Sequence, residues 1–258
     1  MGKARFDPSM KPLFAFCLFL FLAVSIQAED SRLYELRVYY ANPGKLEDLH
    51  SRFRDHTVAL FEKHGMTNVG YWVPTENPDN KLVYLLSYPD MEARKAAWNG
   101  FLNDPDWKAA YQASVAEGKL VGKVEKRFLI ATDYSLGFDI GQQDPARLFE
   151  LREYETNPGK LKNLDARFRD HTISLFAKHG IVNHLYSHLA KEQDKDELML
   201  IYFVSHKNEE ARNASFKAFG ADPAWQEARK NSEKDGKLLI KGGVTSTLLM
   251  PTDYSPTR

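Results

Sequence analysis

The chain has 258 residues, and 43% of them are hydrophobic, which is enough for one large or two small domains each to bury a core. Its 35 basic residues are balanced by 35 acidic residues without a basic excess or patch, so we expect no nucleic-acid partner. The only cysteine, Cys17, excludes a disulfide framework and a cysteine-based metal site.

Residues 1–28 have the pattern of a secretory signal peptide. Three basic residues precede the apolar run LFAFCLFLFLAV, and the following SIQA ends at Ala28, a small residue suited to cleavage. The run is shorter than the roughly 20 apolar residues of a membrane span. We therefore expect cleavage after Ala28, no stable membrane span in the mature protein, and a periplasmic or secreted location.

The first folded element is expected to be a strand over residues 33–40, LYELRVYY, because its letters alternate and favour β structure. The letters NPG end this strand. The spacing of the apolar residues that follow predicts a helix from Leu46 to Gly65, where glycine provides a C-cap.

The remaining segments of this unit predict two strands, two helices and a final strand, over residues 67–73, 81–88, 90–102, 105–118 and 123–131. The two strands are joined through PTENPDN, whose Pro, Asn and Asp residues form turns. The second of the two helices starts with a proline, which is favourable because its missing N–H is not needed there. The order βαββαβ is that of the ferredoxin-like fold, in the α+β class.

The second half of the chain repeats the first. Residues 34–71 and 149–186 are identical at 23 of 38 positions, and DPDW and TDYS recur later as DPAW and TDYS. We therefore predict a first domain over residues 32–134, a linker over 135–147 and a second domain over 148–254.

A ferredoxin-like unit covers one face of its sheet with helices and leaves the other face to be buried. Two copies in one chain can bury these faces against each other. We therefore predict an intramolecular pseudo-dimer, in which the two sheets form a barrel with the helices outside. The sequence leaves open whether the two-domain chain associates further into a homo-oligomer.

Several motifs occur once in each copy in the same order. The first copy contains Tyr34-Glu35-Leu36-Arg37, Asn42-Pro43-Gly44, Arg54-Asp55-His56-Thr57 and Lys63-His64-Gly65, followed by a tryptophan in the second helical region. This combination resembles the NIPSNAP family over essentially the whole chain after residue 28.

The resemblance implies a dimeric α/β-barrel fold but no common reaction. The wider dimeric α/β-barrel group includes cofactor-free monooxygenases, haem enzymes and small-molecule binders. The signal peptide sets this sequence apart from the mitochondrial members of the family, so their roles do not carry over.

One face of the first strand is polar and unchanged between the copies: Glu35, Arg37 and Tyr39 recur as Glu150, Arg152 and Tyr154. One interpretation places these residues between the two sheets as ion pairs capped by a tyrosine hydroxyl, because buried charges need partners. The other makes them a cavity wall, in which Arg37 or Arg152 holds a carboxylate or an enolate-like oxygen through its forked donors.

Two histidines of the first helix also recur, as His171 and His179. On a helical projection His64 faces inward at the helix end, where it can bond a C-terminal carbonyl. His56 flanks the apolar stripe, where its imidazole can reach a cavity or bond a neighbouring loop. Because His56 and His64 are eight residues apart, they do not form the helical metal pair that an i, i+4 spacing would give.

No motif indicates a metal or a cofactor, since the chain lacks a Walker loop, a G-x-S-x-G elbow and a haem-ligand signature, and we expect neither. The second copy gains imidazoles on its middle strands, where Val69, Val73 and Tyr88 are replaced by His184, His188 and His206. A single active pocket would favour that copy, although a solvated sheet edge would show the same pattern.

Two functions remain. In the first, the barrel or the space under each sheet binds a small apolar or aromatic molecule without catalysis. The candidate lining residues are Arg37, His56 and Tyr71 in the first copy and Arg152, His171, Tyr186 and His188 in the second. In the second function, the protein is a cofactor-independent monooxygenase or isomerase, with His56 or His171 as the catalytic base and an arginine as the counter-charge.

Overall fold

The computed structural model describes residues 1–2, 30–138, 140–141 and 143–258. The predicted signal peptide therefore lies outside the described residues, apart from Met1 and Gly2. No helix in the described part of the chain is both long and apolar enough to cross a membrane.

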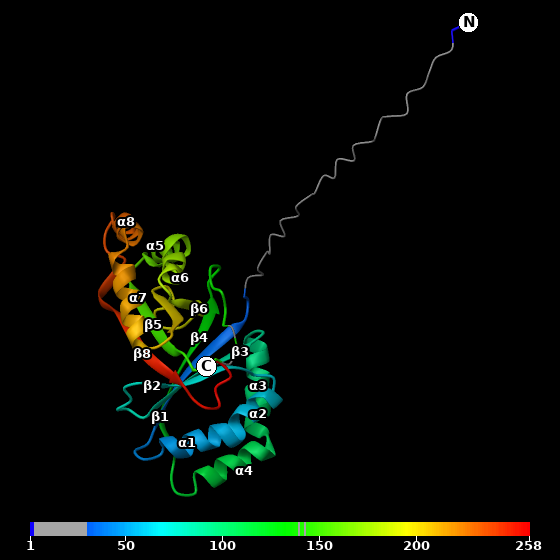
Figure 1. The fold of residues 1–258 in the computed structure, drawn as a ribbon. Coiled ribbons are helices and arrows are strands. Elements are labelled where there is room, and N and C mark those ends of the chain that lie inside the picture. Colours follow the sequence, from blue (N-terminus) through cyan, green and yellow to red (C-terminus); the bar gives the residue numbers. More distant parts are fainter. Residues whose placement is uncertain (3–29, 139, 142) are drawn as a thin grey trace.

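Each copy folds in the predicted βαββαβ order (Figure 1). The first copy consists of β1 (Leu33–Ala41), α1 (Leu46–Arg52), the π-helix η1 (Phe53–Thr57), α2 (Val58–Lys63), β2 (Thr67–Pro74), β3 (Lys81–Tyr88), α3 (Met91–Asn103), α4 (Pro105–Ser114) and β4 (Val121–Ala131). The second consists of β5 (Leu148–Thr156), α5 (Leu161–Arg167), the π-helix η2 (Phe168–Thr172), α6 (Ile173–Lys178), β6 (Val182–Leu189), β7 (Met199–His206), α7 (Glu209–Ala221), α8 (Pro223–Ser232) and β8 (Leu239–Pro251).

The starts of α3 and α4 follow their capping residues. Asp90 accepts a hydrogen bond from the backbone N–H of Ala93 at 2.8 Å, and Asp104 accepts one from the backbone N–H of Asp106 at 2.8 Å. Pro105 occupies the first helical position of α4, as predicted. The end of α4 at Ser114 comes before the predicted end at Gly118.

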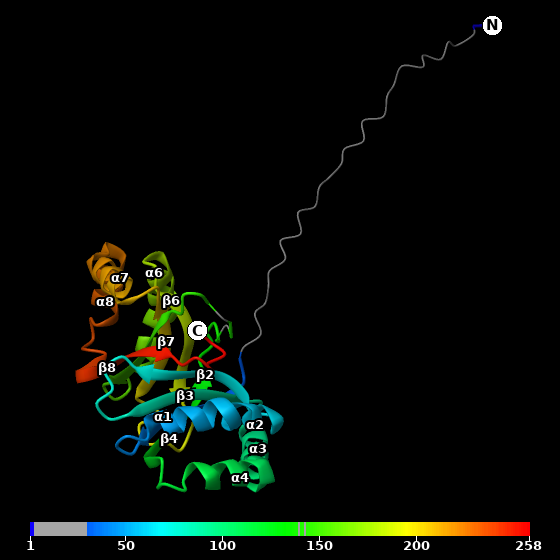
Figure 2. The same ribbon diagram turned by 60° about the horizontal axis from the view of Figure 1, so that its bottom comes forward.

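The strands form one closed antiparallel barrel in the order β1-β3-β2-β8-β5-β7-β6-β4, and the helices of the two copies lie on opposite sides of it (Figures 1 and 2). Each copy supplies four adjacent strands. The copies join at two seams, where Trp72 of β2 lies opposite Pro251 of β8 and Leu129 of β4 lies opposite Leu189 of β6. The predicted intramolecular dimeric α/β barrel is confirmed.

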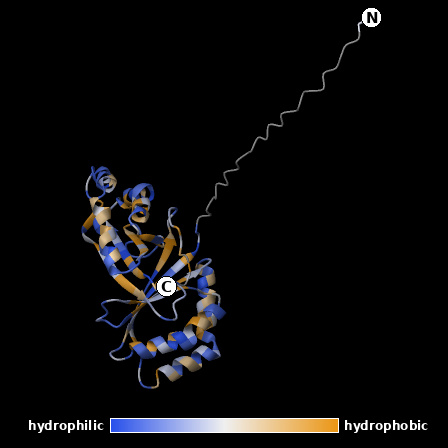
Figure 3. Ribbon diagram, viewed as in Figure 1, coloured by the Kyte–Doolittle hydropathy of each residue, from blue (hydrophilic) through white to orange (hydrophobic). Residues whose placement is uncertain are grey.

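Side chains from both copies fill the barrel interior. Trp72 is fully buried there, and its ring lies 5.5 Å from that of Phe149 and 5.6 Å from that of Phe203, centroid to centroid. Phe138, from the segment between β4 and β5, covers Trp72 at 5.9 Å. Hydrophobic residues accordingly dominate several of the barrel strands in Figure 3, whereas the helices are mixed. The middle of the barrel is a packed core, so a ligand cavity must lie elsewhere.

Each copy also sends the segment after its last strand onto the other copy. The N–H of Thr132 donates to the carbonyl of Tyr186 at 2.9 Å, and the N–H of Thr252 donates to the carbonyl of Tyr71 at 2.9 Å. Both segments carry the repeated letters TDYS. We call residues 132–135 and 252–255 the crossing arms.

Candidate functional site

An apolar cavity of about 410 Å³ lies in the first copy between the sheet and the helices, lined by residues of β1, η1, α3, α4 and β4 among others. This volume falls within the roughly 300–1,000 Å³ of typical small-molecule sites. We call it the first-copy cavity. Its location corresponds to the space under each sheet that the sequence offered as an alternative to the barrel interior.

Aromatic rings make up much of the wall of the first-copy cavity. The rings of Phe101 and Trp107 lie 4.3 Å apart, and those of Phe61 and Trp98 lie 5.4 Å apart, between centroids. These contacts tie α2, α3 and α4 together. The wall therefore consists of rigid apolar surfaces suited to a planar apolar molecule.

The rim of the first-copy cavity exposes large hydrophobic side chains. Leu102, Tyr111 and Val124 are 53%, 43% and 45% exposed, and all three line the cavity. Exposed apolar residues that cluster at one opening are typical of a ligand entrance, whereas single exposed apolar residues scattered over a surface are normal and indicate no site.

Glu35 is fully buried behind the cavity and accepts hydrogen bonds from four side chains. Arg37 Nη1 donates at 2.6 Å, Arg94 Nε and Nη2 each at 2.9 Å, Trp98 Nε1 at 3.0 Å and the Tyr88 hydroxyl at 3.1 Å. Burial alone would raise the pKa of Glu35, but the two arginines outweigh it and hold the pKa below its usual value. The carboxylate is thus ionised and fixes both arginines.

The position of this polar face differs from the prediction. Glu35, Arg37 and Tyr39 face the helices, whereas Leu36 and Val38 point into the barrel core. Alternation along a strand shows which residues share a face, but both faces of this sheet are buried, so the pattern could not show which face meets the helices. The interpretation as an ion pair is right about the pairing and wrong about the layer, and Arg37 and Tyr39 also line a cavity, as the other interpretation had it.

Arg52 of α1 lies against the same cavity without an acidic partner. It is only 6% exposed, and its Nη1 donates to Ser114 Oγ at 3.1 Å. Its guanidinium stacks over Trp107 and Tyr111, each at 5.5 Å from the ring centroid. Its Nε is buried without a hydrogen-bond partner, and no ion pair joins Arg52 to a carboxylate of the described residues. Burial lowers the pKa of this guanidinium.

The structure does not bring His56 and Arg37 to one cavity. His56 is exposed on η1 and lines a separate outer groove of about 400 Å³, which Arg52 also borders. His171 is likewise exposed on η2. The buried side of each π-helix carries its phenylalanine and threonine instead, Phe53 and Thr57 in the first copy.

The histidines at the helix ends, His64 and His179, have carboxylate partners in place of the expected backbone carbonyl. His64 Nε2 lies 2.6 Å from Asp104 Oδ2, and His179 Nε2 lies 2.8 Å from Asp222 Oδ2. They join the first helical region of each copy to the N-cap of α4 or α8.

The predicted lining residues Tyr71 and Tyr186 lie in the packed layers under the helices. Tyr71 stacks on Tyr84 with ring centroids 5.5 Å apart, and Tyr186 stacks on Tyr202 at 5.0 Å. Both are fully buried, and Tyr71 does not line the first-copy cavity. The expectation that Arg37, His56 and Tyr71 surround one ligand therefore does not match the geometry.

His188 lies at a contact between the copies. Its Nε2 is 2.9 Å from Asp165 Oδ1, which also accepts a hydrogen bond from the Tyr134 hydroxyl of a crossing arm at 2.7 Å. This arrangement gives His188 a structural role between β6, α5 and the arm.

The second copy repeats the buried ion network with its own residues. Arg152 pairs with Glu150 and donates from Nη2 to the Tyr154 hydroxyl at 2.9 Å. Arg212 donates to Glu150 from Nε at 2.8 Å and from Nη2 at 2.9 Å, and His206 Nε2 lies 3.1 Å from the same carboxylate. Arg152 is therefore held by the same kind of network as Arg37.

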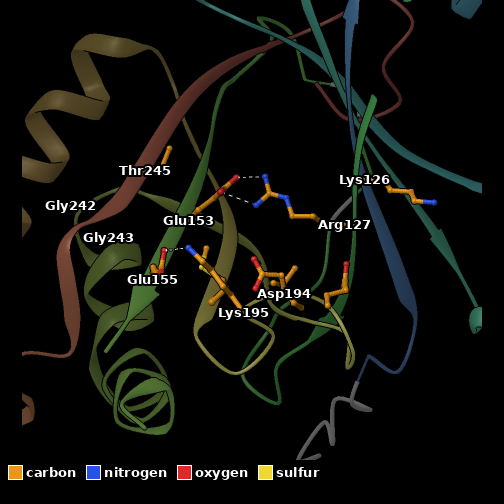
Figure 4. A pocket seen from close by; sticks show the side chains of 12 residues that line it. Lys126, Arg127, Glu153, Glu155, Asp194, Lys195, Gly242, Gly243 and Thr245 are labelled. Atoms are coloured by element: carbon orange, nitrogen blue, oxygen red, sulfur yellow. Dashed lines mark hydrogen bonds and ion pairs between the residues drawn. The ribbon is translucent and has the colours of Figure 1, made fainter. Parts of the chain in front are cut away.

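A larger cavity, of about 580 Å³, lies at one mouth of the barrel (Figure 4). Four of its six charged lining residues are paired, since Arg127 donates twice to Glu153 at 2.8 Å and Lys195 pairs with Glu155 at 2.8 Å. Most of its charged groups are thus already paired, and no aromatic residue of the described ranges lines it, so this mouth is a weaker candidate than the first-copy cavity.

The sequence interpretation missed Arg52, Arg94 and the lining tryptophans. A signal was available, because both arginines recur, as Arg167 and Arg212. Their positions in the sequence did not predict that they meet β1 residues at one cavity, because only the fold places α1 and α3 over β1. No group of three or more metal-ligating side chains occurs within the described ranges.

Comparison with known proteins identifies one family. The NIPSNAP family model matches residues 34–136 and 149–256, once per copy. No curated protein matches the chain. Among solved structures, a NIPSNAP-like domain protein from Burkholderia xenovorans is 20% identical, with 45% of this chain and 97% of that chain covered and a TM-score of 0.38.

Two longer structures cover both copies. A putative monooxygenase from Lactobacillus acidophilus is 11% identical over 86% of this chain and 94% of its own, with a TM-score of 0.54. A putative monooxygenase from Fusobacterium nucleatum is 12% identical over 86% of this chain and 92% of its own, with a TM-score of 0.55. At such identities these structures show a shared barrel fold and nothing about the reaction.

Proposed function

The chain belongs to the NIPSNAP family, and from that premise we propose that it binds a small apolar or aromatic molecule in the first-copy cavity. Family membership supplies no reaction to carry over. The support comes from the cavity itself, which combines a volume of about 410 Å³, aromatic walls and an apolar rim.

The aromatic lining is the observation that carries this proposal. Phe61, Trp98, Phe101, Trp107 and Tyr111 all border the space, and each ring contacts at least one other. A planar apolar molecule placed among them would remove apolar surface from water on both sides, at roughly 25 cal/mol per Å².

A second candidate is the cofactor-independent monooxygenase or isomerase, favoured by the fold shared with two putative monooxygenases. Such chemistry needs a base within hydrogen-bond reach of the substrate. The described residues that line the first-copy cavity include no histidine, aspartate or glutamate, and His56 borders a different groove. Binding without catalysis therefore fits this site better.

The proposed location is outside the cytoplasm, on the strength of the signal-peptide pattern in residues 1–28. Sequencing of the mature N-terminus from the native host tests it. A start near Glu29 would support export, and an intact Met1 would refute it.

The binding proposal is tested with the neutral probe 1-naphthalenemethanol by ligand-observed NMR. Val124 lines the cavity, and Val244, at the matching place in the second copy, is also 45% exposed. We expect Val124→Trp to weaken binding at least tenfold by filling the entrance, and Val244→Trp to leave it unchanged. Absence of binding to the wild-type protein, or equal binding by all three proteins, would reject the proposal.

Oxygen uptake and isomer formation with phenolic substrates test the second candidate. Turnover that is lost in Val124→Trp and retained in Val244→Trp would favour an enzyme over a binding protein.

A further inference from the structure

On the basis of the proposed binding function, we infer that the molecule held in the first-copy cavity is an apolar carboxylate, and that Arg52 binds its carboxylate group. The second copy carries its own carboxylate at the matching place.

The lining of the first-copy cavity is strongly one-sided in charge. It includes four cationic residues and no acidic one, namely Arg37, Arg52, Arg94 and Lys126. Glu35, behind the wall, is shared by Arg37 and Arg94. Arg52 has no such partner, although it is almost completely buried.

A buried guanidinium without a counter-charge is an unusual arrangement, because removing the charge from water is costly unless an anion compensates for it. Ser114 and the faces of Trp107 and Tyr111 stabilise Arg52 only in part. Its Nε remains without a partner, as does that of Arg167 in the second copy, so the two arginines differ in the carboxylate that is paired with Arg167 alone. A carboxylate matches the planar fork of a guanidinium and forms charge-assisted hydrogen bonds with it.

In the second copy, the corresponding arginine has the carboxylate partner that Arg52 lacks. Arg167 occupies the position of Arg52 and keeps two of its contacts, with its guanidinium 5.1 Å above Trp225 and its Nη1 donating to Ser232 Oγ at 3.4 Å. The third contact differs, because Arg229 stands where the first copy has Tyr111. In addition, Arg167 Nη1 lies 3.6 Å from Glu233 Oε1. Both side chains are largely buried, at 4% and 13% exposure, so this is an internal ion pair.

Glu233 corresponds to Val115 when the copies are aligned on DPDW and DPAW. Val115 is partly buried and packs against the apolar layer of the first copy. Burial alone would raise the pKa of Glu233, but the hydrogen bond from Lys237, at 2.7 Å, and the positive charges of Lys237, Arg229 and Arg167 together outweigh this and lower the pKa. The second copy thus holds an ionised carboxylate beside its arginine, and the first copy leaves that place to the carboxylate of a ligand.

The test uses the full chain and two probes of nearly equal shape, 1-naphthoate and neutral 1-naphthalenemethanol, in calorimetric titrations at one salt concentration. We expect the wild-type protein to bind the carboxylate at least tenfold more tightly than the alcohol. Arg52→Met should abolish this preference while alcohol binding remains. Val115→Glu should abolish it as well, because it rebuilds the ion pair of the second copy.

Two matched controls separate charge from structure. Val115→Gln has almost the same shape as Val115→Glu without the charge and should keep the preference, and Arg167→Met should keep it because it alters only the second copy. If Arg52→Met fails to fold, the comparison of Val115→Glu with Val115→Gln decides the matter. A preference that survives Arg52→Met or Val115→Glu would overturn the assignment. Equal binding of both probes by the wild-type protein would reject the inference and leave the proposed function intact, whereas binding of neither would reject both.

Discussion

At the scale of single residues, Glu35 and Glu150 organise the layer between sheet and helices. Each carboxylate is fully buried and receives two arginines, one from the first strand of its copy and one from the third helix. Packing alone tolerates exchange between apolar residues, as Val58 and Ile173 show. A buried carboxylate with two guanidinium partners has no such freedom, which explains why Glu35, Arg37 and Arg94 recur unchanged.

Arg37→Ala and Arg152→Ala should lower the free energy of unfolding by about 3 kcal/mol each, because each leaves a buried carboxylate with one charged partner fewer. His56→Ala should change it by less than about 0.5 kcal/mol, since His56 is exposed. Urea unfolding of the three variants measures both effects. A His56→Ala variant as unstable as Arg37→Ala would show that η1 has a stabilising contact beyond those described.

His184, which replaces Val69 of the first copy, has a structural role. It is buried between the rings of Phe138 and Phe149, at 5.1 and 5.4 Å, and its Nε2 lies 2.9 Å from Ser205 Oγ. Burial lowers the pKa of His184 from 6.5 to about 4, with a smaller contribution from nearby Arg147. The imidazole is therefore neutral in the folded protein at neutral pH.

Stability should consequently fall as the pH is lowered from 6.5 to 4. In that window the unfolded chain binds a proton at His184 and the folded protein does not, so the proton favours unfolding. The shift corresponds to about 3 kcal/mol at most. His184→Val, which restores the valine of the first copy, should remove this part of the pH dependence in denaturation curves at pH 7, 5.5 and 4. Identical slopes for variant and wild type would contradict the buried neutral imidazole.

At the scale of elements, the sequence predicted the first helical region of each copy but not the π-helix within it. The apolar spacing correctly predicted a helical region from Leu46 onward, but a regular period of 3.6 gives no sign of a wider turn at Phe53–Thr57. Arg54 at this turn reaches a crossing arm, where its Nε and Nη2 donate to Asp253 at 2.6 and 3.0 Å. The recurrence of FRDHT thus reflects a contact between copies, as Arg169 with Asp133 also shows.

The crossing arms should stabilise the copy that they touch, not the copy to which they belong in sequence. Tyr254 packs within 6.4 Å of the ring of Phe53 and within 5.5 Å of that of Tyr71, and its hydroxyl lies 2.8 Å from His50 Nδ1. Tyr254→Ala should therefore cost about 3 kcal/mol, as for other large aromatic deletions.

Hydrogen exchange can locate that loss. We expect faster exchange in α1, η1 and α2 of the first copy for Tyr254→Ala, and in the corresponding helices of the second copy for Tyr134→Ala. Loss of protection confined to the copy that carries the substitution would refute the crossed arrangement.

At the scale of the whole molecule, the duplication lets the two copies differ where they meet. Val38 of the first copy corresponds to Glu153 of the second, and Glu153 pairs across the barrel mouth with Arg127, whose counterpart is Thr247 (Figure 4). In a symmetric dimer of identical chains, each of these positions would carry the same residue in both subunits. Tandem copies can instead evolve one complementary ion pair.

The sequence predicted the barrel well because the strands and helices leave periodic patterns of apolar residues, and because the two copies repeat these patterns in the same order. It placed the site poorly, because side chains around a cavity come from distant segments such as Arg37, Arg52 and Trp107. Residues common to both copies indicated the shared scaffold. The feature that points to a ligand is instead a difference between them, Val115 against Glu233, and its meaning depends on a contact that only the fold shows.

The central claim, that the first-copy cavity holds a small molecule, is tested most directly by native mass spectrometry of protein purified from its own host. We predict a retained small molecule, in a ratio of one per chain, on the wild-type protein and on Val244→Trp, and its loss from Val124→Trp. A molecule retained equally by Val124→Trp, or a wild-type protein of bare chain mass in every preparation, would contradict the claim.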